Sequence, residues 1–367
     1  MRILLIGEFS NVHWSLGTAL RKQGHDVTIV SDGNNWREYP CDVRLRRKSK
    51  SKLHTAIYLI KVLYHLIFKW HGYDVVQLIH PTLFLELRAH RLQKIYDYLR
   101  RRNKKVFMLA AGNDYQYIYD SYVRRRLRYC DYYTAKREVK NDYNSKVVKE
   151  FLYTDKKDVC LHISDTCDGI IAVLYEYYVA YADEYKAKTA YIPLPIEIDE
   201  EKKCDAVQTY PIRLFIGMDH KRDAIKGTDI LYRVAMQLKE RYPEKCEVIK
   251  TESLPYKEYI KIMSGCDMLL DQIYSYTPAM NALKAMSIGI AVASGGEEEH
   301  YEMIKEKELR PVINLIPEEK DIYEKLEEII LHPETISRLK RDGVKYVQKH
   351  HDSLKVAQQY IDFWNSK

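Results

Sequence analysis

The chain has 367 residues, of which 46% are hydrophobic and 30% are charged. These values are typical of a folded globular protein and exclude extensive disorder, and the length is sufficient for two domains. No run of about eighteen uncharged apolar residues occurs, so we predict no membrane-spanning helix. The chain opens on an apolar strand pattern rather than a signal peptide, and its seven cysteines contain no CxxC pair. We therefore expect a cytoplasmic protein with reduced thiols.

The charge is divided unevenly along the chain. Residues 1–150 carry 29 Lys and Arg against 14 Asp and Glu, a balance of +15, whereas the remainder has a balance of −8. Such an asymmetry favours an anionic partner for the first half of the chain.

The first half alternates short apolar runs with helical patterns. A helix is expected over His13–Gln23, where Gly24 provides a C-terminal stop. The expected strands are Ile3–Ile6, Val27–Val30, Asp74–Ile79, Val106–Ala110 and Gly169–Leu174. This alternation predicts an α/β fold with a doubly wound parallel sheet.

The same pattern restarts after Ile192–Pro195, where two prolines restrict the chain as in an interdomain connector. The expected elements are the strands Arg213–Gly217, Glu247–Ile249, Asp267–Gln272, Ile290–Ser294 and Val312–Leu315, the helices Thr228–Tyr242 and Tyr256–Ser264, and two helices from Pro333 to near Trp364. We predict two Rossmann-like domains, residues 1–192 and 193–349, with a helix at 350–367 packing back on the first. Ligands are expected in a cleft between them, at the carboxyl ends of the strands.

The segment Asp267–Tyr301 has the order strand, loop, helix, strand and glycine turn. Thr277 stands where an N-cap is wanted, and Pro278 stands at the first helical position. A helix N-terminus there would present free N–H donors to a phosphate, and Gly295–Gly296 would bring bare backbone to the same place. An ordinary crossover without a ligand fits the pattern equally well.

A second candidate phosphate site is the loop Gly217–Gly227, which follows the first strand of the second half. Its cations include Lys221 and Lys226, which are suited to neutralise a diphosphate leaving group. A solvated basic loop is the alternative. The three glutamates after the glycine turn, Glu297, Glu298 and Glu299, are candidates to accept hydrogen bonds from sugar or ribose hydroxyls. A solvent-facing run of charges is the alternative.

The loop Gly7–His13 opens the first helix without a GxGxxG pattern, which disfavours dinucleotide binding. Its Ser10, Asn11 and His13 are candidates to line an acceptor pocket, with a plain capped turn as the alternative. His80 and Asp114 follow two further strands and are candidates to orient or deprotonate an acceptor hydroxyl. Structural hydrogen bonding is the alternative for both.

The basic cluster Arg44–Lys52 precedes the apolar stretch Leu53–Trp70. A basic cluster beside such a helix suits docking on an anionic membrane surface, and the alternative is a core helix with solvated neighbours. No nucleic-acid-binding motif is visible, so we expect no nucleic-acid partner. No metal-ligand spacing appears either.

Together these stretches resemble the GT-B glycosyltransferases of the large retaining class called family 4. The resemblance is carried by GHDVTIVSDG, DGIIAVLYEYY, IPLPIEID, IKGTDIL and ALKAMSIGIAVASGG. It implies an acceptor-binding first domain, a nucleotide-sugar-binding second domain, retention of anomeric configuration, and no metal or other cofactor. Lys226 matches the phosphate-contacting lysine of the family, and Glu299 matches the acidic residue after the glycine pair.

The chain departs from the family at three positions. Tyr276 and Lys284 stand where the family usually has two glutamates eight positions apart, and Met218 replaces an arginine. Lys284 is a candidate to reach the diphosphate instead.

The expected function is transfer of a sugar from a nucleotide-sugar to a lipid-linked saccharide or another glycan precursor at the cytoplasmic membrane face. Two alternatives remain open, namely a non-catalytic relative that binds nucleotide-sugars or glycans, and a GT-B epimerase acting on a free nucleotide-sugar.

Overall fold

The structure is a computed structural model that describes residues 1–33, 38–83, 85–134, 136, 138, 142–198, 209–219 and 222–367. Its contacts divide the chain into two compact units. Unit 1 comprises Met1–Asp120, Val147–Pro195 and Ser353–Lys367, and unit 2 comprises Ser121–Lys146 and Ile196–Asp352. The expected boundaries placed Ser121–Lys146 in the first domain, whereas the structure groups this segment with unit 2.

Unit 1 is built on a seven-stranded parallel sheet in the order β3-β2-β1-β4-β5-β6-β7. Its strands are β1 (Arg2–Ile6), β2 (Asp26–Ser31), β3 (Val43–Arg44), β4 (Val75–Leu78), β5 (Lys105–Ala110), β6 (Gly169–Ala172) and β7 (Thr189–Tyr191). In the central register, Ile3 of β1 lies opposite Val27 of β2 and Val75 of β4. The strands read as continuous apolar runs because helices cover both faces of a parallel sheet.

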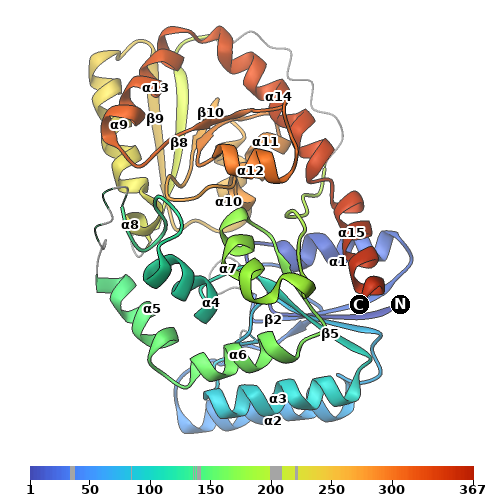
Figure 1. Ribbon diagram of the computed structural model, residues 1–367. Helices are drawn as coiled ribbons and strands as arrows, with labels where there is room; N and C mark the ends of the chain where they lie inside the picture. The colour runs from blue at the N-terminus through green and yellow to red at the C-terminus, as the bar shows by residue number, and fades with distance from the viewer. Residues whose placement is uncertain are drawn as a thin grey trace. The chain divides into compact units, whose positions relative to one another are not determined.

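The helices of unit 1 connect these strands. They are α1 (Val12–Lys22), α2 (Lys52–Phe68), α3 (Ala89–Arg102), α4 (Tyr115–Ile118), α6 (Lys156–Thr166), α7 (Tyr175–Tyr185) and α15 (Ser353–Ser366), while α5 (Asp142–Leu152) runs across the division at Val147. The last helix, α15, packs along α1 (Figure 1). It is anchored by buried Trp364, whose Nε1 donates to Gln77 Oε1 at 3.1 Å.

Unit 2 contains a five-stranded parallel sheet in the order β12-β11-β10-β8-β9. Its strands are β8 (Ile212–Met218), β9 (Cys246–Glu252), β10 (Met268–Leu270), β11 (Ala291–Ser294) and β12 (Val312–Asn314). Its helices are α8 (Asp223–Lys226), α9 (Thr228–Arg241), α10 (Tyr256–Met263), α11 (Met280–Ser287), α12 (Glu298–Met303), α13 (Glu319–Leu331) and α14 (Glu334–His350). Helix α9 packs on β8 and β9, and α11 and α14 pack on β11.

The helix after β10 begins later than the sequence predicts. The expected N-cap was Thr277, but α11 starts at Met280 and its N-cap is Ala279, which has extended backbone. Residues before it are held in the loop instead, because Tyr276 O accepts Glu297 N at 2.9 Å and Thr277 O accepts Ser275 Oγ at 3.2 Å.

Within the described ranges, no helix combines the length and apolarity needed to cross a bilayer. The six cysteines in these ranges are free thiols, and Cys204 lies outside them.

Candidate functional site

The loops at the carboxyl ends of β10 and β11 in unit 2 are joined backbone to backbone. Gly295 N donates to Gln272 O at 2.9 Å, and Glu297 N donates to Tyr276 O at the same distance. A Cβ on Gly295 would lie 1.8 Å from Ser275 O, so only glycine fits this approach. The next amide, Gly296 N, donates to Asn314 Oδ1 at 2.9 Å. The two loops therefore form one hydrogen-bonded edge, at the side of the sheet where ligands of open α/β sheets bind.

Lys226 lies at the end of α8, and its ammonium faces a buried carboxylate. Its Nζ is 3.9 Å from Asp271 Oδ1, whose side chain is 4% exposed, and Asn281 Nδ2 donates to the same oxygen at 3.3 Å. The other oxygen, Asp271 Oδ2, is buried without a hydrogen-bond partner in the part of the chain that the structure describes. Such an oxygen costs free energy until a donor reaches it.

Sequence reasoning missed Asp271 as a site residue because it was counted as part of the apolar strand Asp267–Gln272. The strand β10 ends at Leu270, so Asp271 is the first residue of the loop. The available signal was a carboxylate directly after the run Met-Leu-Leu, where a strand of a parallel sheet reaches its ligand-binding edge.

Arg128 and Tyr129, from the segment Ser121–Lys146, complete a second cluster in unit 2. Arg128 N donates to Tyr276 Oη at 2.7 Å, and the guanidinium lies 5.0 Å from the centre of the Tyr276 ring. Arg128 Nη2 contacts Glu297 Oε2 at 2.7 Å and Glu299 Oε2 at 3.2 Å. The Tyr129 hydroxyl donates to the other oxygen of Glu297.

The electrostatics of this cluster follow from these contacts. Hydrogen bonding to Glu299 raises the pKa of Arg128 above its ordinary value, so the cation balances the two glutamates beside the glycine turn. Burial raises the pKa of Tyr276 and of Tyr129, so both phenols are neutral. Tyr276 contributes a neutral ring, against which the Arg128 guanidinium packs.

The remaining predicted donor residues belong to β8, to α11 and to the loop that precedes α11, apart from one that is not described. Gly217 lies in β8, where a Cβ would meet the Tyr259 ring at 2.6 Å, and Lys284 is half-buried on α11. Thr277 is buried. Because α11 begins at Met280, the free amides of its first turn lie later in the chain than predicted. Lys221 lies outside the described residues.

In unit 1, the structure gives His80 and Asp114 internal partners. His80 Nδ1 accepts Thr82 N at 3.1 Å, so Nε2 carries the proton that it donates to Asn113 O at 2.9 Å. Burial lowers the pKa of His80 to about 4. Asp114 caps α4 by accepting Tyr117 N at 2.8 Å, and its other oxygen accepts the Tyr181 hydroxyl at 2.7 Å. Burial raises the pKa of Asp114 to about 6.

The loop before α1 contains Ser10 and Asn11, both in left-handed backbone conformation. Asn11 Nδ2 donates to Ser15 Oγ at 3.2 Å. His13 Nδ1 bonds to Gly7 O at 2.7 Å, and its buried Nε2 has no partner among the residues described. Burial lowers the pKa of His13 to about 4.

Glu8 is a second residue that sequence reasoning passed over. Its buried carboxyl accepts the backbone N–H of Trp14 at 2.8 Å and of His13 at 3.3 Å, which caps the N-terminus of α1. Burial raises its pKa to about 8. An acidic residue in the turn before a helix was the available signal.

Across the described part of the chain, no group of three or more His, Cys, Asp or Glu side chains is placed to hold a metal ion. The site is instead composed of backbone turns, one lysine facing a buried carboxylate, and an arginine clustered with glutamates.

Two α/β units, each built on a parallel sheet, are typical of the GT-B class of fold. Comparison with solved structures confirms the predicted GT-B fold. The whole chain resembles HepE of Anabaena in complex with UDP-glucose (11% identity, 100% of both chains covered, TM-score 0.59). It also resembles sucrose-phosphate synthase from Thermosynechococcus elongatus (14% identity, 100% of this chain and 99% of that chain, TM-score 0.57). A third similar structure is WaaG, a glycosyltransferase involved in lipopolysaccharide biosynthesis (12% identity, 100% of both chains, TM-score 0.55).

At the sequence level, residues 217–362 match the family model described as glycosyl transferase-like. This match covers most of unit 2, including the Lys226–Asp271 pair and the glycine turn. A search of curated protein sequences found no significant match. The chain thus has the GT-B fold, and its residues 217–362 are similar to a glycosyl transferase-like model.

Proposed function

We propose that this protein is a glycosyltransferase that takes a sugar from a nucleotide-sugar bound by unit 2. The observation that carries the proposal is the edge formed by Lys226, Asp271 and the Gly295–Gly296 turn, within a glycosyl transferase-like domain. A cation beside a glycine turn suits a diphosphate. Stabilising the negative charge that develops on this leaving group is the main requirement of the reaction. The UDP-glucose bound to HepE makes UDP-sugars the first donors to test.

Each residue of this edge has a proposed role. Lys226 neutralises the departing diphosphate beside the glycine turn, and Lys284 of α11 reaches the same diphosphate. Asp271 Oδ2, buried and without a partner among the described residues, accepts a hydroxyl of the donor sugar or ribose. This carboxylate takes over part of the role that the family's paired glutamates would have, since Tyr276 and Lys284 stand in their places.

Arg128 has a supporting role in this proposal. Glu297 and Glu299 would repel a diphosphate at the glycine turn if they were unpaired. Arg128 contacts both carboxylates and so keeps the turn compatible with an anionic donor.

The acceptor side of the proposal rests on the family resemblance. It assigns a lipid-linked saccharide or another glycan precursor to unit 1, near Ser10, Asn11, His13, His80 and Asp114, with retention of configuration and without a metal. His80 and Asp114 act by positioning, since their polar atoms have internal partners. The site of action is the cytoplasmic face of a membrane.

The direct test is a panel of UDP-, GDP- and ADP-sugars, scored by thermal shift and by release of the nucleoside diphosphate. We expect at least one donor to raise the melting temperature. Asp271→Asn should lower the affinity for that donor about tenfold, because one buried charge-assisted hydrogen bond is lost. Lys320→Ala, at an exposed lysine of α13, is the control and should bind normally. No stabilisation by any nucleotide-sugar would overturn the proposal.

Two other functions are distinguished by the same panel. Tyr276 in place of a glutamate, with its hydroxyl bonded to Arg128 N, favours a non-catalytic nucleotide-sugar-binding relative as the second candidate. That protein would be stabilised by a donor without releasing diphosphate when acceptors are supplied. An epimerase would instead convert the free nucleotide-sugar without any acceptor.

A further inference from the structure

The outer face of α2 is apolar and exposed. Leu53, Ile60 and Phe68 are 69%, 66% and 62% exposed. Four further exposed side chains of the helix belong to the same face, namely Ile57, Leu63, Tyr64 and Ile67. Contiguous exposed apolar surface of this kind marks an interaction site rather than ordinary surface.

The inner face of the same helix packs against the rest of unit 1. Its buried side chains are Tyr58, Val62 and Leu66, spaced four residues apart. At 3.6 residues per turn this stripe lies roughly 180° from the exposed apolar residues. A helix with apolar side chains on two opposite faces normally has both faces covered. Here α2 has α3 as a neighbouring helix (Figure 1), and its outer face is open.

The charge around this face identifies the kind of partner. From Val43 to Tyr73 the chain has eight Lys and Arg, three His, and no Asp or Glu. Of these cations, Arg47 pairs with Glu86 and Arg46 lies 4.0 Å from Glu38. A second copy presenting the same face would bring like charges together, whereas a membrane containing anionic lipid would attract them.

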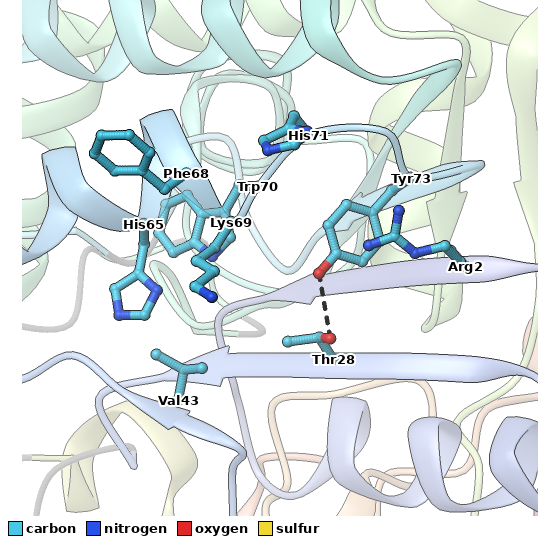
Figure 2. Close-up of a pocket in the computed structure, with 9 residues that line it drawn as sticks. All are labelled: Arg2, Thr28, Val43, His65, Phe68, Lys69, Trp70, His71 and Tyr73. Atoms are coloured by element: carbon cyan, nitrogen blue, oxygen red, sulfur yellow. Dashed lines mark hydrogen bonds between the residues drawn. The ribbon is translucent and has the colours of Figure 1, made fainter.

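A cavity of about 410 Å³ opens at the C-terminal end of α2 (Figure 2). Its basic lining residues are Arg2, His65, Lys69 and His71, and Phe68 belongs to both the cavity lining and the exposed face. Figure 2 shows Lys69 extending from the end of α2 toward the strand that carries Thr28. Arg2 is held at the cavity wall by Asp26 at 3.6 Å and by Gly72 O at 3.1 Å.

We propose that the outer face of α2 docks on a membrane containing anionic phospholipid. The apolar side chains enter the headgroup region while the surrounding cations, with Lys69 at the cavity, contact lipid phosphates. The helix lies in the interface and does not span it. This inference rests on the proposed function, which gives docking its purpose. A transferase with a lipid-linked acceptor must reach that acceptor at a membrane surface.

The test is sedimentation of the full chain with vesicles of phosphatidylcholine, alone or mixed equally with phosphatidylglycerol, at low and high salt. We expect binding to the mixed vesicles only, weakened by salt. Ile60→Asp should reduce this binding at least tenfold, and Lys69→Ala should reduce it less. The matched control is Leu331→Asp, at an exposed leucine of α13 in unit 2, which should bind as the unaltered protein does.

Three results would overturn the docking proposal. They are absence of binding to the mixed vesicles, equal binding to both vesicle types, and normal binding by Ile60→Asp. Concentration-dependent dimerisation that Ile60→Asp abolishes would assign the face to a second copy instead. Thermal shift with nucleotide-sugars, measured on the same preparations without vesicles, separates failure of docking from failure of the donor site.

Discussion

At the scale of single residues, the Arg128 cluster is the feature most open to a direct test. Arg128 is 55% exposed at its side chain, so we expect Arg128→Ala to cost no more than about 1 kcal/mol of unfolding free energy. Donor affinity should fall about tenfold, because Glu297 and Glu299 then face the diphosphate without their cation. Titration calorimetry with the donor found by the panel measures this.

The matched control is Arg310→Ala. Arg310, which lies after α12, pairs with Glu298 at the start of that helix. In the described structure it does not contact Glu297 or Glu299. Its loss should leave donor affinity unchanged. Donor binding that tightens in Arg128→Ala would mean that the arginine competes with the donor.

Glu8 predicts a pH dependence of stability in unit 1. Its pKa is raised from 4.5 to about 8 by burial, so the folded state holds a proton that the unfolded state releases, and stability falls as pH rises toward 8. The pKa values of His13 and His80 are lowered to about 4, so these residues make stability rise with pH. This opposite effect is confined to pH values below the ordinary histidine pKa of 6.5. Between pH 6.5 and 8 we therefore expect a loss of about 1–2 kcal/mol.

Urea unfolding of the protein and of Glu8→Gln at these two pH values measures the effect. The amide cannot ionise, so the loss should be largely absent in Glu8→Gln. An equal loss in both proteins would assign the pH dependence to other groups.

At the scale of elements, the glycine turn after β11 sets the shape of the donor edge. Gly295→Ala places a Cβ 1.8 Å from Ser275 O, a backbone atom that the two loop–loop hydrogen bonds hold in place. We expect destabilisation of about 2–3 kcal/mol, as for overpacking in a core, with weakened donor binding. Thermal unfolding and the donor titration would show both effects.

Gly265→Ala is the control for this change. The nearest atom to its added Cβ is Ile262 O at 3.5 Å, which is ordinary contact. A small effect there and a large one at Gly295 would locate the constraint in the turn. Comparable effects at both positions would contradict it.

The elements also show which parts of the structure the sequence could predict. The apolar strands of both sheets were predictable because strands in parallel sheets are buried on both faces. The start of α11 was mispredicted because Thr277 and Pro278 suit a helix start locally, whereas the hydrogen bond from Glu297 N to Tyr276 O holds the loop from twenty residues away. Such a contact has no local signal.

At the scale of the whole molecule, the pattern of two α/β halves was predictable and the grouping of Ser121–Lys146 was not. That segment belongs to unit 2 through contacts between Arg128 or Tyr129 and residues about 150 to 170 positions later. The departures at Tyr276 and Lys284 were visible in the sequence. The contact of Tyr276 with Arg128 could not be predicted, because Arg128 lies in a segment expected in the other domain.

The claim that unit 2 binds a nucleotide-sugar through Lys226 is tested most directly by one titration. The donor selected by the panel is titrated calorimetrically into the unaltered protein, Lys226→Ala and Lys320→Ala. We predict saturable binding, weakened at least tenfold by Lys226→Ala because a diphosphate loses its facing cation, and unchanged by Lys320→Ala. Binding that is absent from the unaltered protein, or equal in all three, would contradict the account.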